Sequence, residues 1–111
     1  TGAITAMPGV AIYGASKRGL RAACESLRLE LAPQGINVTQ VLPGMFDTGA
    51  LTLDGIVLDG DMPDYDIPWF APDGGPGAPE PLARTVAFAL SLPEGIAINE
   101  LVVRPTGQFN P

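Results

Sequence analysis

The amino-acid sequence contains no histidine, which excludes histidine-dependent catalytic triads and most zinc sites. Its single cysteine, Cys24, cannot form an internal disulfide, and this favours an intracellular, cytoplasmic protein. Six basic residues stand against twelve acidic ones, so the net charge of −6 argues against nucleic acid or an anionic membrane as a partner. No apolar run reaches the ~18 residues that a transmembrane helix needs.

The residues that are present suffice for one small domain. The chain has 111 residues, of which 46% are hydrophobic, so it can build an apolar core and is not wholly disordered. It begins with Thr1 rather than Met, and no signal peptide follows. We therefore expect the chain to be part of a longer protein.

The first long pattern predicts a helix over 10–32, ended by Pro33 and Gly35. Residues recurring every three or four positions mark its inward face. They are Tyr13, Lys17, Leu20, Cys24, Leu27 and Leu31. Three charged residues are expected on the wetter side of the helix, namely Arg21, Glu25 and Arg28.

Two strands and a second helix complete the predicted elements. Residues 36–42 (INVTQVL) form a β-branched run that stops at Pro-Gly, and 96–103 (IAINELVV) form a run apolar enough to be buried on both faces. Residues 81–92 (PLARTVAFALSL) predict a helix with Glu80 in its first turn. The order helix, strand, helix, strand indicates an α/β protein with a parallel sheet.

Residues 45–79 contain six Gly, five Pro and seven Asp, with no basic residue. A connection of this length is usually a functional lid or disordered, and Asp54-Gly55 within it is a hairpin signal. Its one bulky apolar cluster, around Trp69 and Phe70, is expected to close over a ligand. A permanent anchor of Trp69 against the second helix is the alternative. The acidic residues at 59–66 lack the spacing of a calcium loop, so no metal site is predicted.

Tyr13 and Lys17 are four residues apart on the first helix, so their side chains are neighbours. A tyrosine hydroxyl is a poor base at neutral pH, but an ammonium group held close to it favours the phenolate form. The pair is therefore suited to moving a proton to or from a hydroxyl or carbonyl. An aromatic ring beside a lysine that snorkels to solvent is the alternative interpretation.

The second candidate feature is the PGMFDT segment at 43–48, directly after the first strand. In doubly wound folds, ligands bind at the carboxyl ends of the strands. A Pro-Gly turn there frees backbone groups to face a ligand, and Thr48 adds a hydroxyl. An ordinary turn that ends a strand is the alternative.

Taken together, these features resemble the second half of a short-chain dehydrogenase/reductase in their order and spacing. They are the YGASK motif at 13–17, the long helix, the strand NVTQVL at 37–42, Pro43-Gly44 and Thr48. The tail at 99–106 (NELVVRPT) resembles the last strand of a classical branch that includes NADP-dependent 3-hydroxy acid dehydrogenases. The resemblance implies that residues 1–111 are the carboxyl-terminal part of a Rossmann-like doubly wound parallel sheet, with 45–79 as the substrate-side lid.

The resemblance also implies an activity, which is the transfer of a hydride between a nicotinamide cofactor and a hydroxyl or carbonyl of a small molecule. The cofactor would be NADP or NAD, with NADP favoured. Tyr13 would be the general acid/base and would also contact the cofactor, and Lys17 would support it and bind the nicotinamide ribose. The nicotinamide carboxamide would be positioned by Pro43, Gly44, the backbone of Phe46 and the hydroxyl of Thr48. The helix that carries Tyr13 would pack against its copy in a homodimer or homotetramer.

Several family features fall outside the sequence. The substrate-orienting serine would lie one residue ahead of Thr1, and neither Thr1 nor Thr5 is at its register. The glycine-rich phosphate loop and the residue that selects NAD or NADP would also precede the chain. The alternative function is therefore a truncated, catalytically incompetent chain that acts only as an oligomerisation or interaction module.

Overall fold

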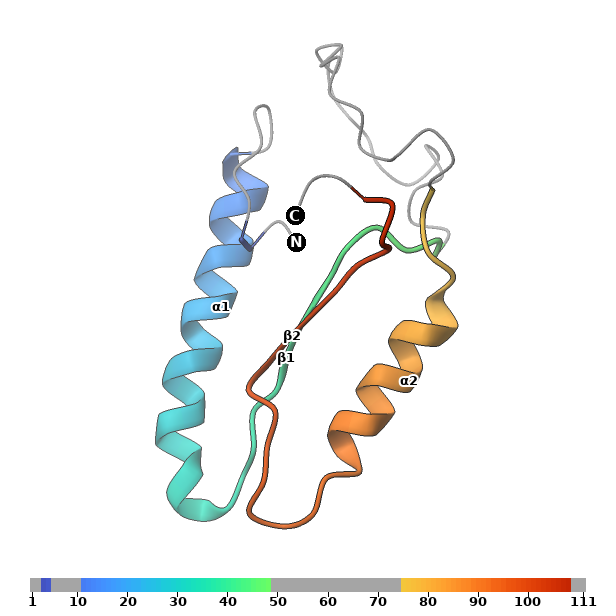
Figure 1. Ribbon diagram of the computed structural model, residues 1–111. Coiled ribbons are helices and arrows are strands. Elements are labelled where there is room, and N and C mark those ends of the chain that lie inside the picture. Colours follow the sequence, from blue (N-terminus) through green and yellow to red (C-terminus); the bar gives the residue numbers. More distant parts are fainter. Residues whose placement is uncertain (1–2, 5–10, 49–74, 109–111) are drawn as a thin grey trace.

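The computed structural model describes residues 3–4, 11–48 and 75–108 of the chain (Figure 1). In chain order the elements are α1 (Ala11–Leu31), the short 3-10 helix η1 (Ala32–Gln34), β1 (Gln40–Pro43), α2 (Pro79–Leu90) and β2 (Glu100–Val103). The predicted order of helix, strand, helix and strand is confirmed, and with it the Rossmann-like α/β class. No helix in these ranges is long and apolar enough to cross a membrane.

The end of α1 shows why the sequence stops the helix there. Gly35 adopts a left-handed backbone conformation, with φ of 72°. Its N–H donates to the carbonyl of Ala32 at 3.0 Å, and the N–H of Ile36 donates to the carbonyl of Leu31 at 3.3 Å. These two bonds satisfy carbonyl groups that the end of a helix leaves open, and glycine is the residue that reaches this conformation without strain. The predicted end of the helix at Pro33 and Gly35 is therefore confirmed.

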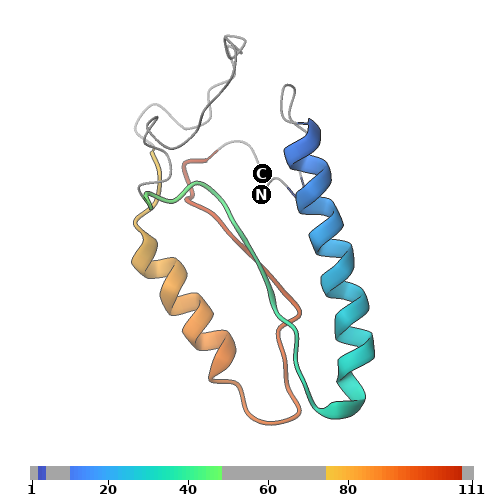
Figure 2. The ribbon, with the colours of Figure 1, turned by 180° about the vertical axis from the view of Figure 1, so that it is seen from behind.

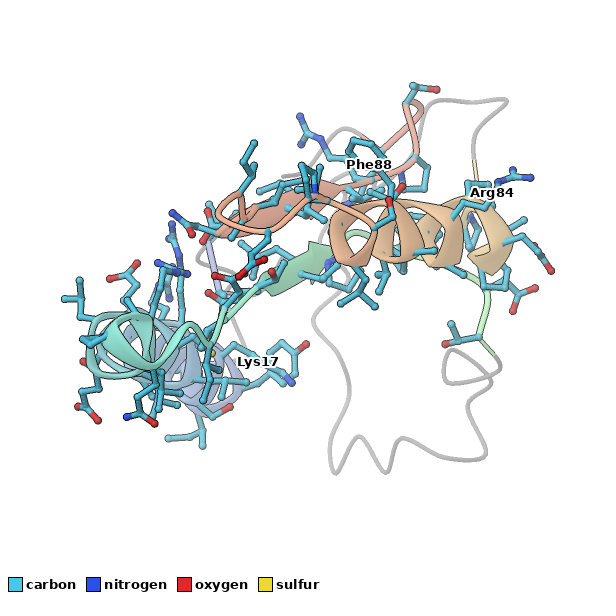
Figure 3. The ribbon with its side chains drawn as sticks, turned by 90° about the horizontal axis from the view of Figure 1, so that it is seen from below. Lys17, Arg84 and Phe88 are labelled. Atoms are coloured by element: carbon cyan, nitrogen blue, oxygen red, sulfur yellow. The ribbon has the colours of Figure 1, made fainter. Side chains whose placement is uncertain are left out.

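The two strands are parallel and pair directly, from Gln40 opposite Glu100 to Pro43 opposite Val103. The helices α1 and α2 lie on opposite faces of this sheet, as the front and rear views show (Figures 1 and 2). The view from below separates the same three layers (Figure 3). The carboxyl ends of both strands and the first turns of both helices therefore lie at one end of the molecule.

Both strands are shorter than their sequence patterns predict. Residues 36–39 and 96–99 precede the ladder, which begins where the N–H of Gln40 donates to the carbonyl of Asn99 at 3.0 Å. A β-branched run favours an extended backbone, but a strand also needs a partner at hydrogen-bonding distance. The second helix also begins earlier than predicted, because Pro79 fits the first helical position, and Glu80 lies in the first turn as expected.

Little apolar surface is buried among the described residues. The buried apolar side chains there are Ala3, Leu42 and Phe46. By contrast, Ile12 is 85% exposed and Leu90 is 80% exposed. The prediction that the second strand is buried on both faces is wrong for this chain, since Val102 is 50% exposed and the other strand residues are only half-buried.

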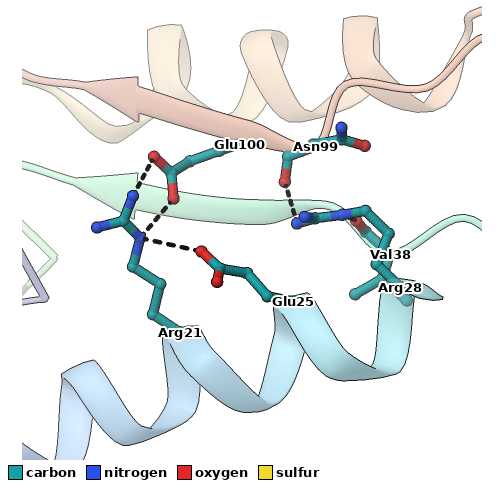
Figure 4. A network of polar contacts seen from close by, with 6 residues as sticks. All are labelled: Arg21, Glu25, Arg28, Val38, Asn99 and Glu100. Atoms are coloured by element: carbon teal, nitrogen blue, oxygen red, sulfur yellow. Dashed lines mark hydrogen bonds and ion pairs between the residues drawn. The ribbon is translucent and has the colours of Figure 1, made fainter. Parts of the chain in front are cut away.

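The helix α1 is joined to the second strand by arginine side chains (Figure 4). Arg21 donates two hydrogen bonds to the carboxylate of Glu100, from Nε at 2.8 Å and from Nη2 at 3.0 Å. Arg28 donates from Nε to the carbonyl of Val38 at 3.2 Å and from Nη2 to the carbonyl of Asn99 at 3.0 Å. A forked guanidinium can hold two acceptors at once, so these contacts fix the rotation of the helix.

This arrangement corrects the predicted orientation of α1. Arg21 and Arg28 face the sheet instead of solvent, whereas Leu20 and Leu27 of the predicted inward face are 56% and 44% exposed. The apolar periodicity locates a stripe on the helix, but it does not say which surface covers that stripe. Here the strand presents a carboxylate and open carbonyls, and arginine is the residue that can pair with them.

We expect the contact between Arg21 and Glu100 to be worth about 1 kcal/mol, because it is bidentate but still partly hydrated. The measurement is a double-mutant cycle with Arg21→Met and Glu100→Leu, read from urea unfolding of the full-length protein. Glu25→Gln is the matched control, since the carboxylate of Glu25 is 4.0 Å from the same guanidinium and more exposed. A coupling energy no larger than that of the pair Arg21 and Glu25 would show that the contact does not hold the helix.

Candidate functional site

Tyr13 and Lys17 lie in the first two turns of α1, where the sequence places them. The Lys17 ammonium nitrogen is 5.4 Å from the centre of the Tyr13 ring, which is within the range of a cation–π contact. Tyr13 is 51% exposed, and Lys17 is exposed as well. Figure 3 shows the Lys17 side chain leaving α1 toward the side on which α2 lies, while Arg84 and Phe88 project from the other edge of the molecule. The pair is thus adjacent and open to a ligand.

The segment after β1 continues the strand and is held from two sides. On the side of β2, the N–H of Gly44 donates to the carbonyl of Val103 at 2.7 Å. The next N–H, that of Met45, donates to the side-chain oxygen of Gln108 at 2.9 Å. Because Gly44 has no side chain, the turn that follows β2 can approach it closely. A Cβ added at Gly44 would lie 2.6 Å from the Cβ of Arg104.

On its other side the same segment pairs with Gly77. The N–H of Gly77 donates to the carbonyl of Met45 at 2.9 Å, and the N–H of Asp47 donates to the carbonyl of Gly77 at 2.8 Å. The buried ring of Phe46 packs over Gly77, and a Cβ at that glycine would be 3.0 Å from the ring. The two ends of the acidic segment predicted over 45–79 are therefore joined, and its last residue, Pro79, begins α2.

This pairing determines where the backbone of Phe46 points. In an extended chain, successive N–H groups point to opposite sides. The carbonyl of Met45 and the N–H of Asp47 both point to Gly77, so the N–H of Phe46 between them is directed away from Gly77. Within the described part of the chain, this N–H makes no hydrogen bond. It is an unpaired backbone donor on a residue that is 8% exposed.

The two predicted parts of the site lie at the same end of the sheet, since the first turns of α1 and the carboxyl end of β1 are both there (Figure 1). No hydrogen bond joins Tyr13 or Lys17 to residues 43–48 within the ranges that the structure describes. Thr48 is exposed at the last described position of the segment. The structure thus places both parts at the edge where α/β proteins bind ligands, but not in contact.

Sequence reasoning missed two residues of this region, Gly77 and Gln108. Each holds the segment after β1 through a contact between residues far apart in the chain, and no local pattern signals such a contact. The partner of Glu100 is Arg21, which no local sequence pattern indicates. Cys24, a member of the predicted inward face of the first helix, is a half-buried free thiol.

Several predictions fall outside the described residues. They are the roles of Thr1 and Thr5, the hairpin at Asp54-Gly55, the acidic residues at 59–66 and the cluster around Trp69 and Phe70. Among residues 3–4, 11–48 and 75–108, no group of three or more His, Cys, Asp or Glu side chains is placed to hold a metal ion.

Comparison with known proteins gives one family. Residues 1–54 match the family model described as short chain dehydrogenase. The chain is 36% identical over 100 residues to a glycine betaine reductase of Emericella nidulans, covering 88% of this chain and 7% of that protein. It is 33% identical over 107 residues to an uncharacterized oxidoreductase of Listeria monocytogenes, covering 95% of this chain and 41% of that protein.

A third relative is an uncharacterized oxidoreductase of Staphylococcus aureus, 31% identical over 94 residues, or 85% of this chain and 34% of that protein. The chain therefore spans less than half the length of each of these relatives. No solved structure matches the chain significantly.

We expect Gly44→Ala to lower the free energy of unfolding by about 1–3 kcal/mol, because its Cβ would overlap the turn at Arg104. Gly19→Ala in α1 is the matched control, since nothing lies within 4 Å of a Cβ there. The Gly19→Ala variant should be more stable than the wild type by about 0.5–1 kcal/mol, because alanine has a higher helix propensity than glycine. Equal effects of the two substitutions in thermal or urea unfolding would contradict the close approach.

Proposed function

Because the chain belongs to the short-chain dehydrogenase/reductase family, we propose that it forms part of an oxidoreductase that transfers a hydride between NADP or NAD and a small alcohol or carbonyl compound. The observation that carries the proposal is the placement of the Tyr13–Lys17 pair and the unpaired N–H of Phe46 at one end of the sheet. The relatives named as oxidoreductases support the reaction class.

The residues present fit a nicotinamide cofactor. Such a cofactor carries the hydride chemistry when it is bound. Its carboxamide needs backbone partners, and the directed N–H of Phe46 meets that need beside Pro43, Gly44 and the hydroxyl of Thr48. The exposed ammonium of Lys17 is suited to the hydroxyl groups of the ribose. The resemblance of the carboxyl-terminal tail to NADP-dependent enzymes favours NADP over NAD.

The proton is handled by Tyr13. When a carbonyl is reduced, for which the cofactor would supply the hydride, the Tyr13 hydroxyl would give its proton to the carbonyl oxygen. When an alcohol is oxidised, the phenolate takes that proton back. The Lys17 ammonium lies against the Tyr13 ring and stabilises the negative charge that Tyr13 carries after it has given up the proton.

The test begins with binding. The full-length protein is titrated with NADPH and with NADH, and we expect saturable binding, tighter for NADPH. It is then assayed for oxidation of the bound reduced cofactor with a panel of small aldehydes and ketones. Absence of binding to either cofactor would reject the oxidoreductase and favour the non-catalytic interaction module.

Substitutions then test the roles of the two side chains. Tyr13→Phe removes only a hydroxyl, so it should lower kcat by about 10²–10⁴-fold with little change in cofactor binding. Lys17→Met should lower kcat and also weaken cofactor binding, because the ammonium serves both. Ser26→Ala, an exposed position further along the same helix, is the control. Normal turnover by the Tyr13→Phe enzyme would rule out its role in proton transfer.

We also propose that α1 pairs with its copy in a homodimer or homotetramer. Leu20, Ala23 and Leu27 are spaced to share one flank of the helix, and all three are exposed. Leu20→Glu combined with Leu27→Glu should dissociate the assembly in light scattering, whereas Ser26→Glu should not. If the molecular mass of the double variant in light scattering is unchanged, this flank of α1 makes its contact within the protomer.

A further inference from the structure

Gln108 joins the last turn of the described chain to the segment after β1. Its side chain is among the most buried of the polar ones, with 5% of the residue exposed. The Oε1 atom accepts a hydrogen bond from the N–H of Met45 at 2.9 Å, across 63 residues of sequence. The backbone N–H of Gln108 donates to the carbonyl of Pro105 at 3.1 Å, and this bond closes the turn that carries Gln108.

The contact compensates for a break in the ladder. The N–H groups of Gly44 and Met45 both donate to the segment formed by β2 and the turn after it. In a regular strand, two successive N–H groups point to opposite edges, so the backbone twists between these residues. Gln108 supplies the acceptor that the second N–H needs after the twist. Without it, a half-buried backbone donor would lose its partner.

The opposite edge of the segment is held by Gly77. The carbonyl of Met45 and the N–H of Asp47 both bond to it, so the N–H of Phe46 is directed away from Gly77. The close approach at Gly44 leaves little freedom on the other side, since Arg104 and Gln108 both lie against that residue. The bonds to Gly77 thus set the direction of the Phe46 donor, and the Gln108 contact holds the preceding residue from the other edge.

We propose that Gln108 is a positioning residue for the nicotinamide end of the cofactor site, acting through the Met45 backbone. This inference rests on the proposed function, because it assigns the Phe46 donor to the cofactor carboxamide. Gln108 does not touch the cofactor in this scheme. It keeps the segment at 43–48 in the conformation that binds the nicotinamide, and it has no effect on the adenine end.

The test compares two ligands that differ only in the nicotinamide. One is NADPH, and the other is 2′-phospho-ADP-ribose, which lacks the nicotinamide ring. If the wild-type protein prefers NADH, the pair becomes NADH and ADP-ribose. Dissociation constants are measured by calorimetry on the full-length protein, with thermal unfolding as the check on folding.

Gln108→Met keeps the length of the side chain but removes the acceptor. We expect it to weaken NADPH binding about tenfold, as for the loss of one net hydrogen bond, and to leave 2′-phospho-ADP-ribose binding unchanged. Gln108→Glu retains an acceptor oxygen and should rescue most of the affinity. Thr106→Ala, an exposed position in the same turn, is the control and should change neither constant.

A second variant, Gln108→Asn, is one methylene too short to reach Met45 and should show the same selective loss if the methionine variant does not fold. Equal weakening of both ligands by the folded variants would show a merely structural role and overturn the inference. Unchanged NADPH binding would also overturn it. A wild-type protein that binds NADPH normally separates either outcome from a failure of the proposed function.

Discussion

The parallel pairing of β1 with β2 is the constraint on which the rest of the structure depends. It begins at Gln40 and Glu100 and extends beyond the strands to the bond between Gly44 and Val103. Because the strands are parallel, their carboxyl ends lie at the same end of the sheet, and the first turns of α1 and α2 lie at that end as well. The candidate site is thus a product of strand pairing before it is a product of any single side chain.

The helix that carries Tyr13 and Lys17 is joined to this sheet by polar contacts. Arginine side chains reach a carboxylate and two backbone carbonyls of the strand region (Figure 4). Directional hydrogen bonds of this kind define the rotation of the helix about its axis better than apolar packing would. They also leave apolar residues of α1 open on a neighbouring flank, which is the surface proposed for a second copy.

The two parts of the site are held rigid in different ways. The tyrosine and lysine are neighbours through the helix repeat, so their proximity is local and robust. The segment at 43–48 has no repeating structure of its own, and its conformation comes from β2, Gly77 and Gln108. The conformation of this segment therefore depends on residues far from it in sequence, including a glutamine in the last described turn.

The sequence by itself determined the two helices, the end of α1 and the adjacency of Tyr13 and Lys17. These features follow from local rules: the helix repeat, proline at a first turn, and glycine where a left-handed residue ends a helix. It also indicated the ligand-binding edge, since the PGMFDT segment follows a strand.

The tertiary structure alone decided the rest. The β-branched run at 36–42 forms a ladder only from Gln40, because pairing needs a partner strand at hydrogen-bonding distance. Arg21 turns to the sheet because Glu100 is there to receive it, and no helical periodicity contains that information. The contact between Gln108 and Met45 likewise joins residues that only folding brings together, since a hydrogen bond depends on spatial distance and direction and not on separation along the chain.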